Sequence, residues 1–102
     1  MIMENRLNSN QCGEAEAKVI RGILEHFEIT AEDMFSDSNK QPGSRARQTY
    51  VFVMVSKYGW KYENCRQVIG CSHSYVSQIM KRYYAKMSTE IGRKKFSYIQ
   101  NL

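Results

Sequence analysis

Residues 62–83, YENCRQVIGCSHSYVSQIMKRY, decide how the rest of the chain is interpreted. Gly70 separates two segments of helical periodicity, and glycine readily adopts the positive φ that ends a helix. Ser72 is suited to cap the helix that follows, because its hydroxyl accepts a hydrogen bond from the first turn. Along that second segment, apolar residues recur at helical spacing at Val76, Ile79, Met80, Tyr83 and Met87. The stretch therefore predicts a helix-turn-helix.

The opposite face of the second predicted helix is polar and basic. It carries Ser74, Ser77, Gln78, Lys81 and Arg82, side chains that suit phosphates and base edges. The alternative is a pair of surface helices that pack together without a ligand. Arg66 occupies a position on the first helix where a small residue usually faces the partner, and we expect its guanidinium to extend outward.

Charge is divided unevenly along the chain, whose formal net charge is +5 over 102 residues. Residues 1–37 contain eight acids and three bases, whereas residues 38–102 contain twelve bases and only Glu63 and Glu90 as acids. The first part is therefore −5 and the second +10. This division predicts that one side of the protein faces a polyanion, with binding that weakens as salt is raised.

The chain length suits one domain, and the cysteine pattern points to no disulfide framework. The three cysteines, Cys12, Cys65 and Cys71, form no CxxC pair, and we interpret the latter two as small core residues in a reducing cytosol. A metal held by Cys65, Cys71 and His73 is the alternative. No apolar run approaches the roughly 20 residues of a membrane span, and the first residues lack the apolar core of a signal peptide. We expect a cytoplasmic protein without a cofactor or metal.

In chain order, residues 1–12 predict a flexible arm and residues 13–102 one helical domain. An amphipathic helix is expected over 14–27, with Val19, Ile20 and Ile23 inside and Glu16 on the wet side. Thr30 and Asp33 have the spacing of a capping box for a short helix that ends near Ser36. A loop containing the chain's only proline follows.

A third long helix is expected over residues 44–58, although its centre, YVFVMV, has the composition of a buried strand. Its length suits a helix, and the rest of the chain offers no partner strand. An apolar surface on every side also fits a central helix. After the helix-turn-helix, a last helix is expected from Ser88 onward, with Ile91, Phe96 or Tyr98, and Ile99 packing inward. The fold class is thus all-α, a compact domain of about five to six helices.

The order of these motifs resembles the C-terminal DNA-binding domain of the bacterial replication initiator DnaA. The resemblance covers residues 17–87 and rests on ITAEDMF after the first helix, the basic loop ending in SRARQ, the long apolar helix, and SHSYV, similar to the family's Asp-His-Thr-Thr-Val signature. It implies a Trp-repressor-like helical fold that binds double-stranded DNA in replication initiation or transcriptional regulation.

The resemblance also implies which residues bind DNA. The family's basic loop sends arginine into the minor groove, where negative potential is concentrated, and this role falls on Arg45 and on Arg47, for which a solvated or phosphate-facing charge is the alternative. Its signature begins the recognition helix in the major groove. The DNA-binding residues expected here are Arg45, Arg47, Ser72, His73, Ser74, Tyr75, Gln78, Lys81 and Arg82, with Lys40 and Lys61 flanking the same surface.

Departures from the family pattern predict a different target sequence. Ser72 replaces the family's acid, which weakens a contact to an amino group such as that of cytosine. Tyr75 replaces its second threonine, and the segment before the acid is about one residue shorter. The alternative interpretation of His73 is a polar residue near a helix cap. The alternative for Gln78 is a side chain that is simply solvated. We expect a monomer that recognises a non-palindromic site.

Enzymatic activity is not expected. The family's ATPase module binds nucleotide through a GxxxxGK[ST] loop, and these 102 residues contain no such sequence. His26 and His73 fall on different predicted helices, with no acidic cluster beside either. A different class of function remains open, in which the basic face and the aromatic residues Tyr58, Trp60, Tyr62 and Tyr75 bind an acidic protein.

Overall fold

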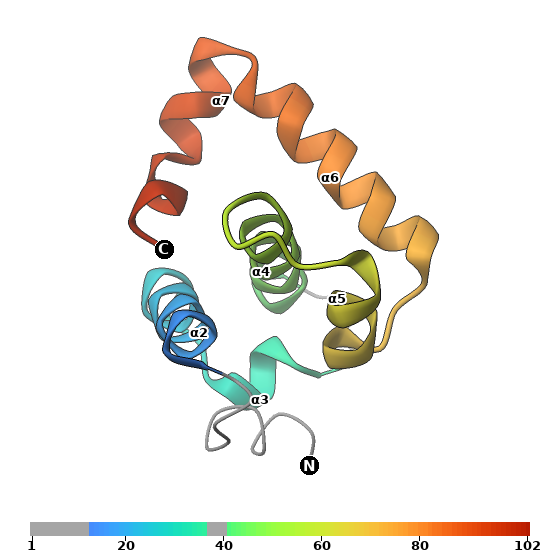
Figure 1. Cartoon of the computed structure of the whole chain (residues 1–102). Coiled ribbons are helices and arrows are strands. Elements are labelled where there is room, and N and C mark those ends of the chain that lie inside the picture. The colour runs from blue at the N-terminus through green and yellow to red at the C-terminus, as the bar shows by residue number, and fades with distance from the viewer. Residues whose placement is uncertain (1–12, 37–40) are drawn as a thin grey trace. The chain divides into compact units, whose positions relative to one another are not determined.

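The computed structural model describes residues 13–36 and 41–102. The arm expected at residues 1–12 and the flanking residue Lys40 lie outside the described residues. In the described part every regular element is helical: α2 (Gly13–Phe27), α3 (Ala31–Met34), α4 (Gly43–Ser56), α5 (Tyr62–Ile69), α6 (His73–Met87), α7 (Glu90–Lys95) and the 3₁₀ helix η1 (Ser97–Asn101) (Figure 1). The expected all-α class is confirmed. The chain divides into two units, Met1–Tyr50 and Val51–Leu102, which are described in turn.

In the first unit, α2 buries one apolar stripe. Val19, Ile20 and Ile23 are each at most 1% exposed, as their helical spacing predicts. The prediction for Glu16 is wrong, because this residue was expected on the solvent-facing side and is only 1% exposed. Its carboxylate accepts a hydrogen bond from the Tyr50 hydroxyl on α4. A partner 34 residues away in the sequence thus makes burial of this acid tolerable.

Helix α3 is one turn long and is fixed by its cap. The Asp33 N–H donates to Thr30 Oγ1 at 3.1 Å, and the Thr30 N–H donates to the Asp33 carboxylate at 3.4 Å. This is the capping box that the sequence predicts. The helix ends at Met34, two residues before the expected end.

Helix α4 settles the ambiguity of the YVFVMV segment in favour of a helix. It runs over Gly43–Ser56, and every residue from Tyr50 to Met54 is at most 5% exposed. Burial on every side over Tyr50–Met54 explains why the apolar residues of this segment show no helical periodicity. Beyond its end, Gly59 has the positive φ of 71° expected of a stop.

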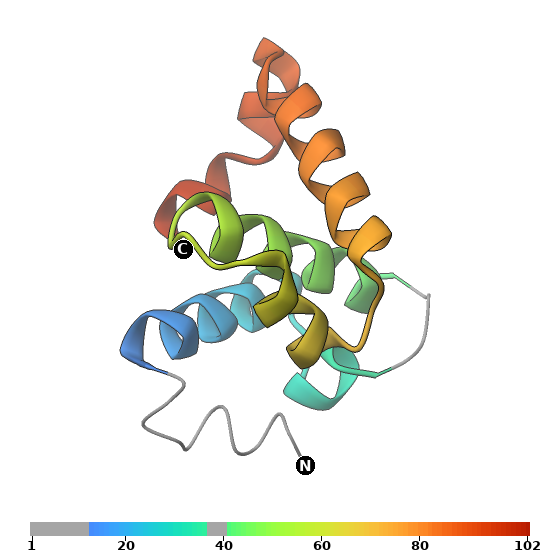
Figure 2. The ribbon, with the colours of Figure 1, turned by 45° about the vertical axis from the view of Figure 1, so that its right-hand side comes forward.

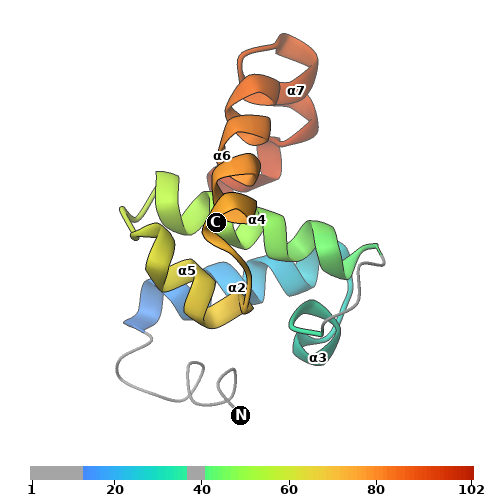
Figure 3. The same cartoon turned by 90° about the vertical axis from the view of Figure 1, so that its right-hand side faces the viewer.

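In the second unit, α5 and α6 are joined by three residues, Gly70 to Ser72 (Figure 3). Beyond α6 the chain folds back through α7 and η1 (Figure 2). The buried hydrophobic residues of this unit, each at most 7% exposed, are Val51, Phe52, Val53, Met54, Cys65, Val76, Ile79, Met80, Tyr83, Phe96, Ile99 and Leu102.

The last part of the chain departs from the single helix that was expected from Ser88. Thr89, not Ser88, caps α7, since its hydroxyl accepts from the Gly92 N–H. The helix stops at Lys95 and a 3₁₀ helix continues it. Phe96 and Ile99 are buried as expected. Ile91 was expected to pack inward, and that prediction is wrong, because its side chain is 81% exposed.

Candidate nucleic-acid interface

Helix α6 separates an apolar face from a polar and basic one. Val76, Ile79, Met80 and Tyr83 are at most 4% exposed. Its other side carries the exposed polar and basic residues His73, Ser74, Gln78, Lys81 and Arg82, whereas Ser77, which was expected on this face, is half-buried. Since these five recur at helical spacing, they form one face, which we call the α6 polar face. Lys61, just before α5 in the same unit, is also exposed.

The turn before α6 fixes where this helix begins. Gly70 has φ 76° and ψ 40°, and its N–H donates to the Arg66 carbonyl at 2.7 Å. Ser72 Oγ then accepts from the Tyr75 N–H at 3.1 Å. The Ser72 hydroxyl oxygen is therefore engaged in the cap, which leaves its hydroxyl hydrogen to donate to a ligand.

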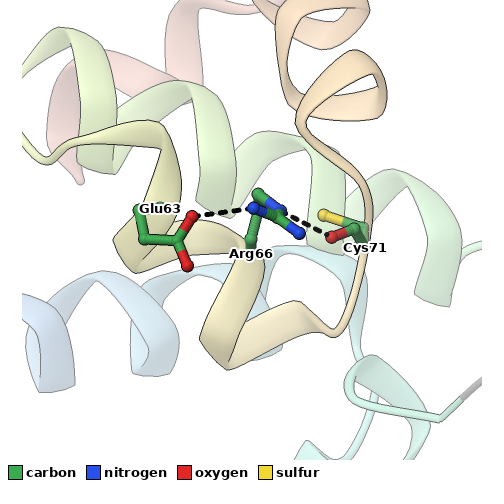
Figure 4. A network of polar contacts seen from close by, with 3 residues as sticks. All are labelled: Glu63, Arg66 and Cys71. Atoms are coloured by element: carbon green, nitrogen blue, oxygen red, sulfur yellow. Dashed lines mark hydrogen bonds and ion pairs between the residues drawn. The ribbon is translucent and has the colours of Figure 1, made fainter.

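Arg66 ties α5 to this turn (Figure 4). Its Nε donates to the Cys71 carbonyl at 3.2 Å, and its Nη1 lies 2.7 Å from a Glu63 carboxylate oxygen. The guanidinium thus does not extend only into solvent as expected, but spans the helix and the connecting backbone. The i, i+3 spacing of Glu63 and Arg66 indicates their pairing in the sequence, whereas the bond to Cys71 depends on the path of the turn.

We expect replacement of Arg66 by alanine to lower the free energy of unfolding by about 1 kcal/mol, because the Cys71 carbonyl loses its charged donor. Urea unfolding followed by circular dichroism measures this. Glu63→Gln is the matched control: it removes only a surface ion pair, whose side chains are 40% and 59% exposed, and we expect less than about 0.5 kcal/mol. Equal losses in the two variants would contradict a bracing role for the bond to the turn.

The first residues of α6 combine an aromatic contact with an exposed helix start. The rings of His73 and Tyr62 lie 5.1 Å apart, which places an exposed imidazole against α5. The first turn of α6 contains no acid. Its N-terminal N–H groups therefore present partial positive charge without a carboxylate nearby in the helix to neutralise it. Tyr75, in the same turn, is half-buried.

The two arginines expected in the minor groove have different surroundings in the first unit. Arg45 is exposed in the first turn of α4. Arg47 is only 7% exposed, and its Nη1 donates to the Met34 carbonyl at 2.8 Å. In this structure Arg47 therefore holds α3 to α4, and it is left out of the interface proposed below.

The position of Arg45 is not explained by helix stability. A cation in the first turn of a helix lies at the positive end of the helix dipole, which is mildly unfavourable. The first turn of α4 carries no acid to offset it. An exposed arginine held there is better suited to an external anion.

The described residues give no indication of a metal site or of a reactive thiol. They contain no group of three or more His, Cys, Asp or Glu side chains that could hold a metal ion. Cys65 is buried and Cys71 half-buried, both as free thiols. Partial burial raises the pKa of the Cys71 thiol, despite the opposing effects of a backbone hydrogen bond and of Arg66. Cys71 therefore stays protonated at neutral pH and is a poor nucleophile.

Comparison with protein-family models, curated proteins and solved structures gave no match. Among the described residues, no helix combines the length and the apolar character needed to cross a membrane.

Proposed function

We propose that this protein is a sequence-specific binder of double-stranded DNA, with α5 and α6 acting as a helix-turn-helix of the kind found in the initiator's Trp-repressor-like domain. The observation that carries the proposal is the α6 polar face, which lies opposite a fully buried apolar stripe on a capped helix. Such a helix can be anchored on one side while the other enters a major groove.

In this proposal the residues have distinct tasks. Ser72, His73, Ser74 and Tyr75 at the start of α6 face base edges, and Gln78 reads a base one turn later. Lys81, Arg82 and Lys61 contact phosphates, which position the helix without reading sequence. Arg45, in the first unit, contributes a contact in the minor groove. The protein acts as a monomer at a non-palindromic site, in replication initiation or transcriptional regulation near the nucleoid.

Binding selection from a random duplex library at near-physiological salt tests this proposal. We expect enrichment of a short non-palindromic sequence, whose affinity falls steeply as salt is raised. A palindromic consensus with two half-sites about 10 base pairs apart would overturn the monomer. Failure to enrich any sequence would overturn DNA recognition and favour an acidic protein as the partner.

Alanine at Arg45 is expected to weaken binding to the selected duplex by about 1 to 3 kcal/mol, because a guanidinium leaves a groove of high negative potential. Fluorescence anisotropy with the selected duplex measures the change. Arg21→Ala is the matched control, since Arg21 is an exposed arginine on α2 that the proposal leaves out of the interface. An affinity equal to that of the wild type would remove Arg45 from the interface.

A further inference from the structure

The chain folds back between α6 and α7 (Figure 2). A second concentration of positive charge lies on the last turns of these two helices. Lys86 is in the last turn of α6, and Arg93, Lys94 and Lys95 form the last turn of α7. All four are exposed, and we call them the α6–α7 corner. Glu90 is the single acid in residues 84–102. None of the four corner residues takes part in the function proposed above.

Helix stability explains this cluster only in part. Basic residues at a helix C-terminus interact favourably with the dipole, and Arg93 Nη1 donates to the Met87 carbonyl at 3.2 Å. Lys94 Nζ lies 3.6 Å from Glu90, but both side chains are more than three-quarters exposed, so the ion pair holds the lysine weakly.

The remaining two lysines bring like charges from different helices to one place. The ammonium groups of Lys86 and Lys95 lie 5.5 and 5.9 Å from the centroid of the same ring, Phe96. Phe96 is 3% exposed, so the ring is fixed and holds both cations near it. Two lysines from different helices are thus placed around one ring, where a polyanion can meet both charges.

We propose that the α6–α7 corner is a second DNA-binding surface, which takes the phosphodiester backbone next to the site that α6 reads. The inference rests on the proposed function. Lysine ammonium groups are point charges without the fork that reads guanine, so this surface contributes affinity and not sequence preference.

The length of α6 sets where this contact falls. Its 15 residues span about 22 Å at 1.5 Å per residue, and the corner lies at the opposite end from Ser72. That length equals about six base pairs of duplex. With α6 lying along the groove, the corner meets phosphates outside the bases that the start of α6 reads, and it needs a duplex that extends beyond the core site.

The test compares two duplexes, one holding only the selected core sequence and one extended by about 10 base pairs on each side. We expect Lys94→Ala/Lys95→Ala to bind the long duplex roughly tenfold more weakly and the short one nearly as well as the wild type does. On the long duplex, the slope of log affinity against log salt should fall by about 2, since each phosphate contact contributes about 0.9.

Lys18→Ala/Arg21→Ala is the control, because it removes the same charge from exposed positions on α2. We expect it to leave the ratio of the two affinities unchanged. Lys94→Gln/Lys95→Gln repeats the test with longer side chains, and thermal unfolding verifies that each variant is folded.

The outcomes separate this inference from the proposed function. Equal losses on the two duplexes, or an unchanged salt slope on the long one, would overturn the second surface while specific binding by the wild type stands. Wild-type protein that selects no duplex would overturn both. If Ile91→Ser weakened binding to the long duplex and the lysine variants did not, the corner would act through apolar contact. That result would overturn its role as a phosphate site.

Discussion

Replacing Tyr83 by alanine is expected to destabilise the protein by about 4 kcal/mol, which is a large share of the stability of a small domain. Tyr83 is 2% exposed. Its ring centroid lies 5.1 Å from that of Phe52 on α4 and 5.1 Å from that of Phe96 at the end of α7. One side chain on α6 therefore contacts both aromatic neighbours, and its removal leaves a cavity where they meet.

Urea unfolding measures this loss, and the chain offers two matched controls. Tyr83→Phe keeps both ring contacts, and we expect it to cost at most about 1.5 kcal/mol. Tyr84→Ala removes the neighbouring tyrosine, which is 55% exposed and touches Phe52 from the edge. It should cost about 1 kcal/mol. A loss for Tyr83→Ala no greater than that for Tyr84→Ala would contradict a central role for the Tyr83 ring.

Gly92→Ala is expected to cost about 3 kcal/mol, because there is no room for a methyl group at this position. An added Cβ would lie 1.8 Å from the Lys86 carbonyl oxygen and 2.6 Å from the carbonyl carbon. These are backbone atoms, so relief requires α7 to move away from the end of α6. The midpoint of thermal or urea unfolding reports the change.

Gly59→Ala is the informative comparison for Gly92→Ala. At Gly59 an added Cβ has open space, but φ is +71°, which disfavours alanine by about 1 to 2 kcal/mol. Gly92 is thus required because a larger residue has no space there, and Gly59 because of its backbone conformation. If Gly92→Ala were tolerated better than Gly59→Ala, the close packing of α7 on the end of α6 would be refuted.

Local signals in the sequence were enough to locate the start of α3, the end of α5 and the start of α6. Thr30 with Asp33, Gly70 and Ser72 act through neighbours at most four residues away, so their roles follow from residue type and spacing. The choice of a helix for YVFVMV came from length and from the lack of a partner strand, and the structure agrees.

The sequence was least informative where a distant residue decides whether a side chain is buried. Glu16 is buried because Tyr50 reaches it from α4, and Arg47 is buried because the Met34 carbonyl ends α3 beside it. Neither partner is visible in the local pattern. The exposure of Ile91 likewise depends on tertiary packing, because α7 packs against the end of α6 through the adjacent Gly92. The polar face of α6 was predictable from periodicity alone, whereas the convergence of Lys86 and Lys95 on Phe96 required the tertiary structure.

At Ser72, capping of α6 and contact with a ligand place different requirements on the side chain. The start of α6 requires only a short side chain with an oxygen that accepts from the Tyr75 N–H, and aspartate, asparagine or threonine meets that requirement as serine does. The hydrogen-bonding groups that the side chain presents outward differ among serine, threonine, aspartate and asparagine. This position can therefore change its outward chemistry during evolution while the geometry of the helix stays intact.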